Sequence, residues 1–112
     1  TLTKWNMYSN SLSGTIPTEI GRLTNMTLFD VGKNLMSGSI PTEFGKCTAL
    51  IQIGLQKNYF SGNLSDILCR GDGTVFNEFW SDCSTLNVTC SCCTDCCDGN
   101  QTCTEQVQNA GT

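Results

Sequence analysis

The sequence predicts an α/β-type solenoid, made mostly of β-strand and coil, in which three repeats stack short parallel strands and a disulfide-rich cap closes the C-terminal end. Two residue types recur at intervals of 24 residues and predict the stack: Asn10, Asn34 and Asn58, and Gly14, Gly38 and Gly62. The cap is predicted by the cysteines, because eight of the nine lie between positions 69 and 103.

Each repeated position has a physical role. The alternation at Phe29 and Val31 predicts a short parallel strand with one face turned inward. The asparagine follows where the chain leaves that strand, and we expect its buried amide to bond backbone groups of adjacent coils, forming a ladder. The glycine permits a backbone conformation or approach that a Cβ would block. Since no coil can bury its apolar residues alone, we expect the coils to share one core.

The stretches NSLSGTIPTEIGRLTNM and NLMSGSIPTEFGKCTAL carry a family resemblance. They resemble the plant-type leucine-rich repeat, and the likeness covers residues 2 to about 68. It implies a right-handed leucine-rich-repeat stack of three 24-residue repeats. The third repeat departs from the pattern, with Ser65 in place of proline and Cys69 in place of glycine, so we expect the coil to change into a cap there.

Three segments follow from this interpretation: repeats over 1–68, a cysteine-rich cap over 69–103, and a tail or linker over 104–112. Residues 74–80 are expected to add a fourth strand, with Phe76, Phe79 and Trp80 covering the end of the core. The cysteine pattern of the cap resembles end caps of some secreted algal leucine-rich-repeat proteins.

Cys47 occupies the inward position that Leu23 holds in the first repeat, so we expect a free, buried thiol. The remaining cysteines are even in number and suffice for four bridges, although their pairing is left open among about 105 possibilities. A thiolate cluster for a soft metal is the competing interpretation of this segment. The expected disulfide cysteines are Cys69, Cys83, Cys90, Cys92, Cys93, Cys96, Cys97 and Cys103.

Several functional classes are disfavoured. The net charge is −4 and the six basic residues are scattered, so no nucleic-acid partner is expected. No apolar run approaches the roughly 20 residues of a membrane span. The chain has no histidine, so a Ser-His or Cys-His pair cannot form. We therefore expect no enzymatic activity, no catalytic residue, no cofactor and no metal.

Four sequons predict N-linked glycans, at Asn25, Asn63, Asn87 and Asn100. Sequons and a disulfide framework together predict an extracellular protein, either secreted or held at the cell surface.

Outward positions of the strands define an expected concave face. Its residues are Lys4, Asn6, Tyr8, Leu28, Asp30, Gln52 and Gln56. Two glycines and short polar groups predict a flat, weakly featured surface. Trp5 aligns instead with the inward positions Phe29 and Ile53 and is expected in the core.

The first coil is as apolar as the coils that follow it and lacks a polar cap. We expect an end-to-end interface there, formed by Leu2, Trp5, Met7, Leu12, Ile16 and Ile20. Either further leucine-rich repeats precede Thr1 or another molecule covers this end.

Two functional hypotheses follow. The first is a glycosylated structural protein whose copies stack head to tail into a filament through the uncapped coil. The second is the C-terminal fragment of a recognition receptor or secreted inhibitor that binds protein or glycan on its concave face.

Overall fold

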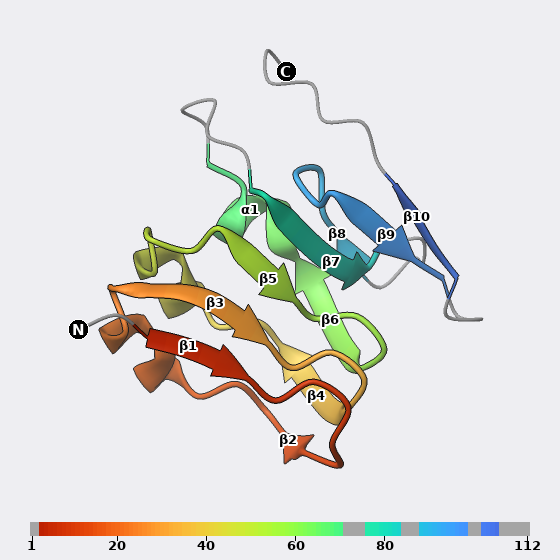
Figure 1. The fold of residues 1–112 in the computed structure, drawn as a ribbon, viewed down its shortest axis with the longest axis horizontal. Helices are drawn as coiled ribbons and strands as arrows, with labels where there is room; N and C mark the ends of the chain where they lie inside the picture. Colours follow the sequence, from red (N-terminus) through yellow and green to blue (C-terminus); the bar gives the residue numbers. More distant parts are fainter. Residues whose placement is uncertain (1–2, 71–75, 84–87, 99–101, 106–112) are drawn as a thin grey trace.

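Two β-sheets and a column of short helices make up the structure, a computed structural model that describes residues 3–70, 76–83, 88–98 and 102–105 (Figure 1). The larger sheet has six strands in the spatial order β1 (Thr3–Asn6), β3 (Met26–Asp30), β5 (Gln52–Gly54), β7 (Glu78–Asp82), β9 (Asp95–Cys97) and β10 (Cys103–Glu105). Its first five strands are parallel, whereas β10 runs antiparallel to β9. β1 and β10 therefore form its opposite edges.

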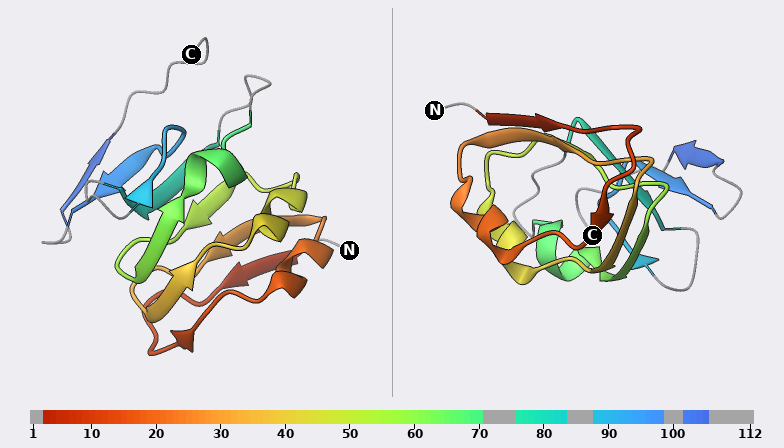
Figure 2. Two further views of the ribbon diagram at one scale, coloured as in Figure 1. Left: turned by 180° about the vertical axis from the view of Figure 1, so that it is seen from behind. Right: turned by 90° about the horizontal axis from the view of Figure 1, so that it is seen from below.

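The smaller sheet has four parallel strands, β2 (Ser13–Gly14), β4 (Leu35–Ser39), β6 (Tyr59–Asn63) and β8 (Val88–Thr89). Two 3₁₀ helices, η1 (Thr18–Arg22) and η2 (Thr42–Lys46), and the α-helix α1 (Leu64–Leu68) form the helical column. In the right-hand view of Figure 2 the two sheets and this column enclose the interior, with β1 and β2 nearest the viewer.

Proline determines where the two 3₁₀ helices begin, and glycine permits them to pack closely. Pro17 and Pro41 each precede a 3₁₀ helix in extended conformation, where proline has a favoured φ and its missing N–H is not needed. A Cβ at Gly21 would lie 2.8 Å from the carbonyl oxygen of Glu43, so glycine permits η1 and η2 to approach closely. The shorter α1 is capped by Asn63, whose side chain accepts a hydrogen bond from the Asp66 N–H.

Inward residues of the three central strands β3, β5 and β7 lie at the centre of the core. Register pairs Phe29 with Ile53 and Ile53 with Phe79, and all three are at most 3% exposed. Phe44 of η2 contacts Phe29 edge to face, with ring centroids 5.1 Å apart. The apolar interior is thus continuous along the sheet and across to the helices.

Glycine is required at one position within the smaller sheet. Gly38 has a φ of +84°, and a Cβ there would lie 2.9 Å from Cγ2 of Thr15 in the preceding unit. Both observations exclude an L side chain without strain.

The expected fold class, an α/β-type leucine-rich-repeat solenoid, is wrong. The chain is a compact globule with principal extents of 37 × 36 × 19 Å, two mostly parallel sheets and a single α-helix among the residues described. Its Cα radius of gyration is 12.8 Å, close to the roughly 13 Å of a compact domain of this size. Six strands about 4.8 Å apart span only about 24 Å, less than the two larger extents of the molecule, so no elongated body results.

The larger sheet runs without interruption across the boundary that the sequence predicted between the repeats and the cap. β7 pairs with β5 on one side and with β9 on the other, so repeat and cap strands share hydrogen bonds. Thr104 and Glu105, assigned to the tail from the sequence, belong to β10. No helix within the described ranges is long and apolar enough to cross a membrane.

Candidate functional site

A hollow of about 250 Å³ opens on the outer face of the six-stranded sheet. It is lined by residues of β3, β5 and β7 and of the turns after β1 and β5: Tyr8, Leu28, Asp30, Gln52, Ile53, Gly54, Gln56, Glu78 and Trp80. Five of the seven residues predicted for the concave face therefore contribute to it, whereas Lys4 and Asn6 do not. The face that the sequence predicted to be flat thus contains a shallow, open hollow.

The hollow exists because glycines lie beneath larger side chains from neighbouring strands. The carboxylate of Asp30 lies over Gly54, where a Cβ would come 2.7 Å from its Cγ. The amide of Gln56 lies over Gly32, where a Cβ would come 2.9 Å from Cδ, Nε2 and Oε1 alike. Both polar groups are thereby drawn down onto the sheet.

Gln56 is the most unusual polar group of the site. The sequence predicted an outward residue, but the side chain is only 7% exposed. Its Oε1 has no hydrogen-bond partner among the described residues. A buried acceptor without a donor costs about 1–3 kcal/mol, so few such groups occur in proteins and each needs an explanation.

Two carboxylates give the hollow its charge. Asp30 Oδ1 accepts a hydrogen bond of 2.9 Å from the Gly32 N–H, and Glu78 Oε1 accepts one of 3.3 Å from Nε2 of Gln52. Desolvation raises the pKa of Asp30 above its ordinary value of 3.8; the Gly32 N–H opposes this, and the nearby charge of Glu78 adds to it. Among the residues that the structure describes, no lysine or arginine lines the hollow.

Aromatic rings from two different units also line the hollow. Tyr8 is 43% exposed and follows β1, whereas Trp80 lies on β7 in register with Gly54. The sequence placed Trp80 over the end of the core, which is wrong, although Phe76 and Phe79 are buried as expected. The interval from Ile53 to its partner Phe79 is two residues longer than the 24-residue repeat, and counting back from Phe79 would have assigned Trp80 and Glu78 to the outer face.

The open first coil is only partly as predicted. Trp5 is 44% exposed on the edge strand β1, so the expectation of a core position is wrong, and it stacks beside Phe29 with centroids 6.5 Å apart. Met7 and Leu12 are half-buried against the core. Ile16 and Ile20 are 4% and 6% exposed, so they belong to the chain's own core rather than to an end-to-end interface. Leu2 lies outside the described residues.

Two of the three predicted asparagines bond the backbone of a neighbouring unit. Asn34 donates from Nδ2 to the carbonyls of Met7, Val31 and Gly32, and its Oδ1 accepts from the Leu12 N–H. Asn58 repeats this one unit further along, with Oδ1 accepting from the Met36 N–H and Nδ2 donating to the Val31 carbonyl. Asn10 is exposed and donates only within its own turn.

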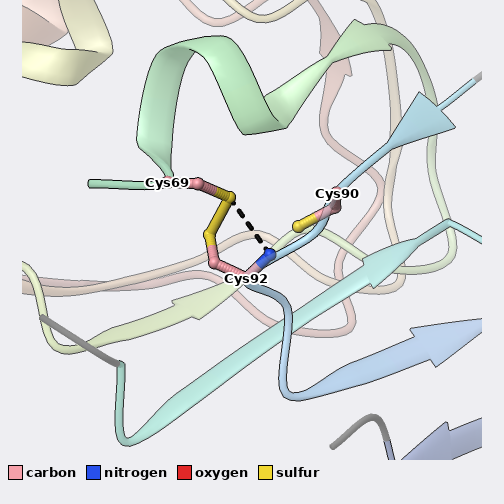
Figure 3. A group of neighbouring side chains, drawn as sticks. All are labelled: Cys69, Cys90 and Cys92. Atoms are coloured by element: carbon pink, nitrogen blue, oxygen red, sulfur yellow. Dashed lines mark hydrogen bonds between the residues drawn. A yellow bond between two sulfur atoms is a disulfide. The ribbon is translucent and has the colours of Figure 1, made fainter. Parts of the chain in front are cut away.

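The cap cysteines form four disulfides, Cys69–Cys92, Cys83–Cys96, Cys90–Cys93 and Cys97–Cys103. They indicate an oxidising, extracellular environment. The sulfur atoms of Cys69, Cys90 and Cys92 lie within 4.8 Å of one another (Figure 3). Metal coordination requires thiolates, and all three sulfurs are covalently paired, so this cluster does not fit a metal site in the oxidised protein.

Cys47 is free and buried, and its Sγ lies 3.2 Å from the Ile20 carbonyl oxygen. Burial raises the pKa of its thiol above 9.0.

Two sequon asparagines, Asn25 and Asn63, are exposed. The other two, Asn87 and Asn100, lie outside the described residues.

Comparisons with family models, with curated proteins and with solved structures found no match. The resemblance to plant-type leucine-rich-repeat proteins stays a prediction from sequence motifs.

Proposed function

We propose that this chain is an extracellular interaction protein, without catalytic activity, whose copies associate head to tail through the two edges of the six-stranded sheet. The observation that carries the proposal is the exposure of Trp5. Its equivalents on β3, β5 and β7 are at most 3% exposed, whereas Trp5 is 44% exposed on a strand that pairs on one side only among the described residues. A further strand laid against β1 would cover Trp5.

Edge strands favour such an addition. The outer edges of β1 and β10 face away from the sheet, and peptide groups at a sheet edge can pair with a strand from another molecule. Figure 1 places these edges at opposite ends of the sheet. Contacts between opposite ends of identical subunits do not close on themselves and give filaments or rings.

Charge also favours head-to-tail contact. Residues 1–57 contain five basic and three acidic residues, a net charge of +2, whereas residues 58–112 contain one basic and seven acidic residues, a net charge of −6. Like ends would repel one another, and unlike ends would attract.

Strand direction gives the contact a register. β10 runs opposite to the other strands, so β1 of an identically oriented copy would lie antiparallel to it. A pairing of Trp5 with Thr104 then sets Lys4 opposite Glu105, and opposite charges across a strand pair are stabilising. In this arrangement the chain is secreted or held at the cell surface, with N-glycans at Asn25 and Asn63, neither of which belongs to β1 or β10.

Charge reversal tests this arrangement. Sedimentation velocity of the glycosylated chain should show concentration-dependent assemblies, and Trp5→Ser should weaken association about tenfold or more. Lys4→Glu and Glu105→Lys should each weaken it, whereas the double variant should regain most of the loss. Tyr59→Ser is the matched control, since it removes an aromatic side chain that is 69% exposed on β6. A wild type that stays monomeric at all concentrations would refute the proposal.

A second candidate function is recognition of a separate partner on the outer face of the six-stranded sheet. The hollow favours it, because Gln56, whose buried oxygen has no donor among the described residues, lines the hollow together with two carboxylates and two aromatic rings. This agrees with the hypothesis of a receptor or inhibitor module.

A further inference from the structure

We infer that the hollow binds the guanidinium group of an arginine side chain presented by a partner protein. This inference rests on the second candidate function, recognition on the sheet face, and specifies the chemistry that is recognised there. It does not depend on head-to-tail association.

The polar side chains of the hollow have unused hydrogen-bond acceptors. Gln56 Oε1 accepts from no group in the described chain, and the Asp30 and Glu78 carboxylates keep acceptor capacity beyond their single bonds to Gly32 and Gln52. A carboxylate accepts only, and it has about four lone-pair sites. Any ligand complementary to the two carboxylates must therefore carry several N–H or O–H donors.

The negative charge of the hollow favours a ligand whose hydrogen-bond donors carry a positive charge. Two carboxylates line the hollow without a basic residue among its lining groups, so a cation gains from both. Desolvation and Glu78 both raise the pKa of Asp30, which means that the site as it stands disfavours its second negative charge. A bound cation would reverse that effect.

Shape favours guanidinium over ammonium. Tyr8 and Trp80 line the hollow, and a planar guanidinium can stack on an aromatic ring while donating in its own plane. The five N–H groups of arginine suit acceptors that lie on different strands, whereas the three donors of lysine surround one point. A hollow of about 250 Å³ equals the volume of about eight water molecules, enough for the end of one arginine side chain.

The test is an NMR titration of the full-length, isotopically labelled chain with N-acetyl-arginine methylamide. We expect saturable shifts at the amides of Gly32 and Gly54 and at the side-chain NH₂ of Gln56, with a dissociation constant in the millimolar range. The citrulline analogue, which is nearly isosteric but neutral, should bind at least tenfold more weakly, and the lysine analogue should fall between the two.

Variants assign the binding to the carboxylates. Glu78→Gln changes an exposed residue and should leave the fold intact while weakening arginine binding about tenfold; Asp30→Asn should do the same. Glu19→Gln on η1 removes one negative charge far from the hollow and should have little effect. Equal binding of arginine and citrulline would overturn the cationic ligand but leave recognition on this face standing. Absence of shifts at the hollow with every probe would overturn both.

Discussion

The side-chain amide of Gln56 lies flat against the backbone of Gly32, one strand away, and is held there with its Oε1 buried and without a partner. The contact leaves no space for a methyl group, because a Cβ at Gly32 would be 2.9 Å from three atoms of the amide. Gly32→Ala should therefore push Gln56 outward, lower the free energy of unfolding by about 1–2 kcal/mol, and weaken arginine binding.

A double-mutant cycle isolates this contact. In a Gln56→Ala background, Gly32→Ala should cost much less, since the group it displaces is gone. Urea denaturation of the four proteins gives the coupling energy. Equal costs in both backgrounds would show that Gly32 is required for a reason other than Gln56.

The raised pKa of Asp30 predicts how stability depends on pH. Because the folded-state pKa lies above the ordinary 3.8, the folded protein binds the proton more tightly than the unfolded chain does. The carboxylate therefore lowers stability as pH rises from 3.8 through the raised pKa, and the loss is complete at neutral pH. Asp30→Asn should stabilise the fold at pH 7, by less than about 1 kcal/mol because the group is half-exposed and screened.

Asparagine suits this test because its Oδ1 can still accept from the Gly32 N–H. Chemical denaturation at pH 7 and near pH 4 measures the difference. The gain should shrink on acidification, and a gain that grows at low pH would contradict the assigned cause. A variant that is more stable yet binds arginine more weakly would show that the site is maintained at the expense of stability.

The asparagine ladder should contribute unequally along its length. Asn34→Ala removes a 5%-exposed amide that joins two units and leaves buried carbonyls and the Leu12 N–H unpaired, at a cost of about 2–4 kcal/mol. Asn10→Ala is the matched control in the same sequence context, and it should cost under about 1 kcal/mol because its bonds are exposed. Thermal and urea unfolding would compare them, and similar losses would refute a role in joining units.

The four disulfides should differ in their stabilising effect. Replacing Cys69 and Cys92 by serine opens a loop of sequence separation 23 and should cost about 3 kcal/mol, whereas the Cys90–Cys93 pair spans three residues and should cost about 2 kcal/mol or less. Denaturation of the two double variants measures the order. The reverse order would mean that strain or packing, rather than loop closure, dominates.

Cys47 should resist chemical modification in the folded protein. Burial keeps its thiol protonated and out of reach of iodoacetamide, so native protein should remain unlabelled and denatured, unreduced protein should take up one label. Mass spectrometry reads out the count. Labelling of several cap cysteines before reduction would contradict the disulfide assignment.

Sequence periodicity indicated which residues share a register but not what covers them. The 24-residue interval aligned Phe29 with Ile53, which β3 and β5 indeed pair. The same alignment placed Trp5 in the core, although nothing in the described chain lies against the outer edge of β1. Aligning the repeats predicts the face of the sheet on which a residue lies. Whether that residue is buried depends also on a neighbouring strand that covers it.

The smaller sheet and the hollow were harder to predict from the sequence. β2 contains only Ser13 and Gly14, and such polar pairs show no alternation by which a strand could be recognised. The hollow depends on the absence of side chains at Gly32 and Gly54, which was interpreted as flatness. Glycine beneath a neighbouring long side chain instead creates depth, and that relationship becomes visible only once strand register is known.

The most direct test of head-to-tail association is complementation between two variants, each blocked at one edge. Lys4→Ser/Trp5→Ser disables the β1 edge, and Thr104→Lys/Glu105→Lys disables the β10 edge. Sedimentation equilibrium should show each variant alone as a monomer of 12.1 kDa protein mass, and an equimolar mixture as a one-to-one dimer that grows no further. Self-association of the β10-blocked variant alone, or a mixture that stays monomeric, would contradict the account.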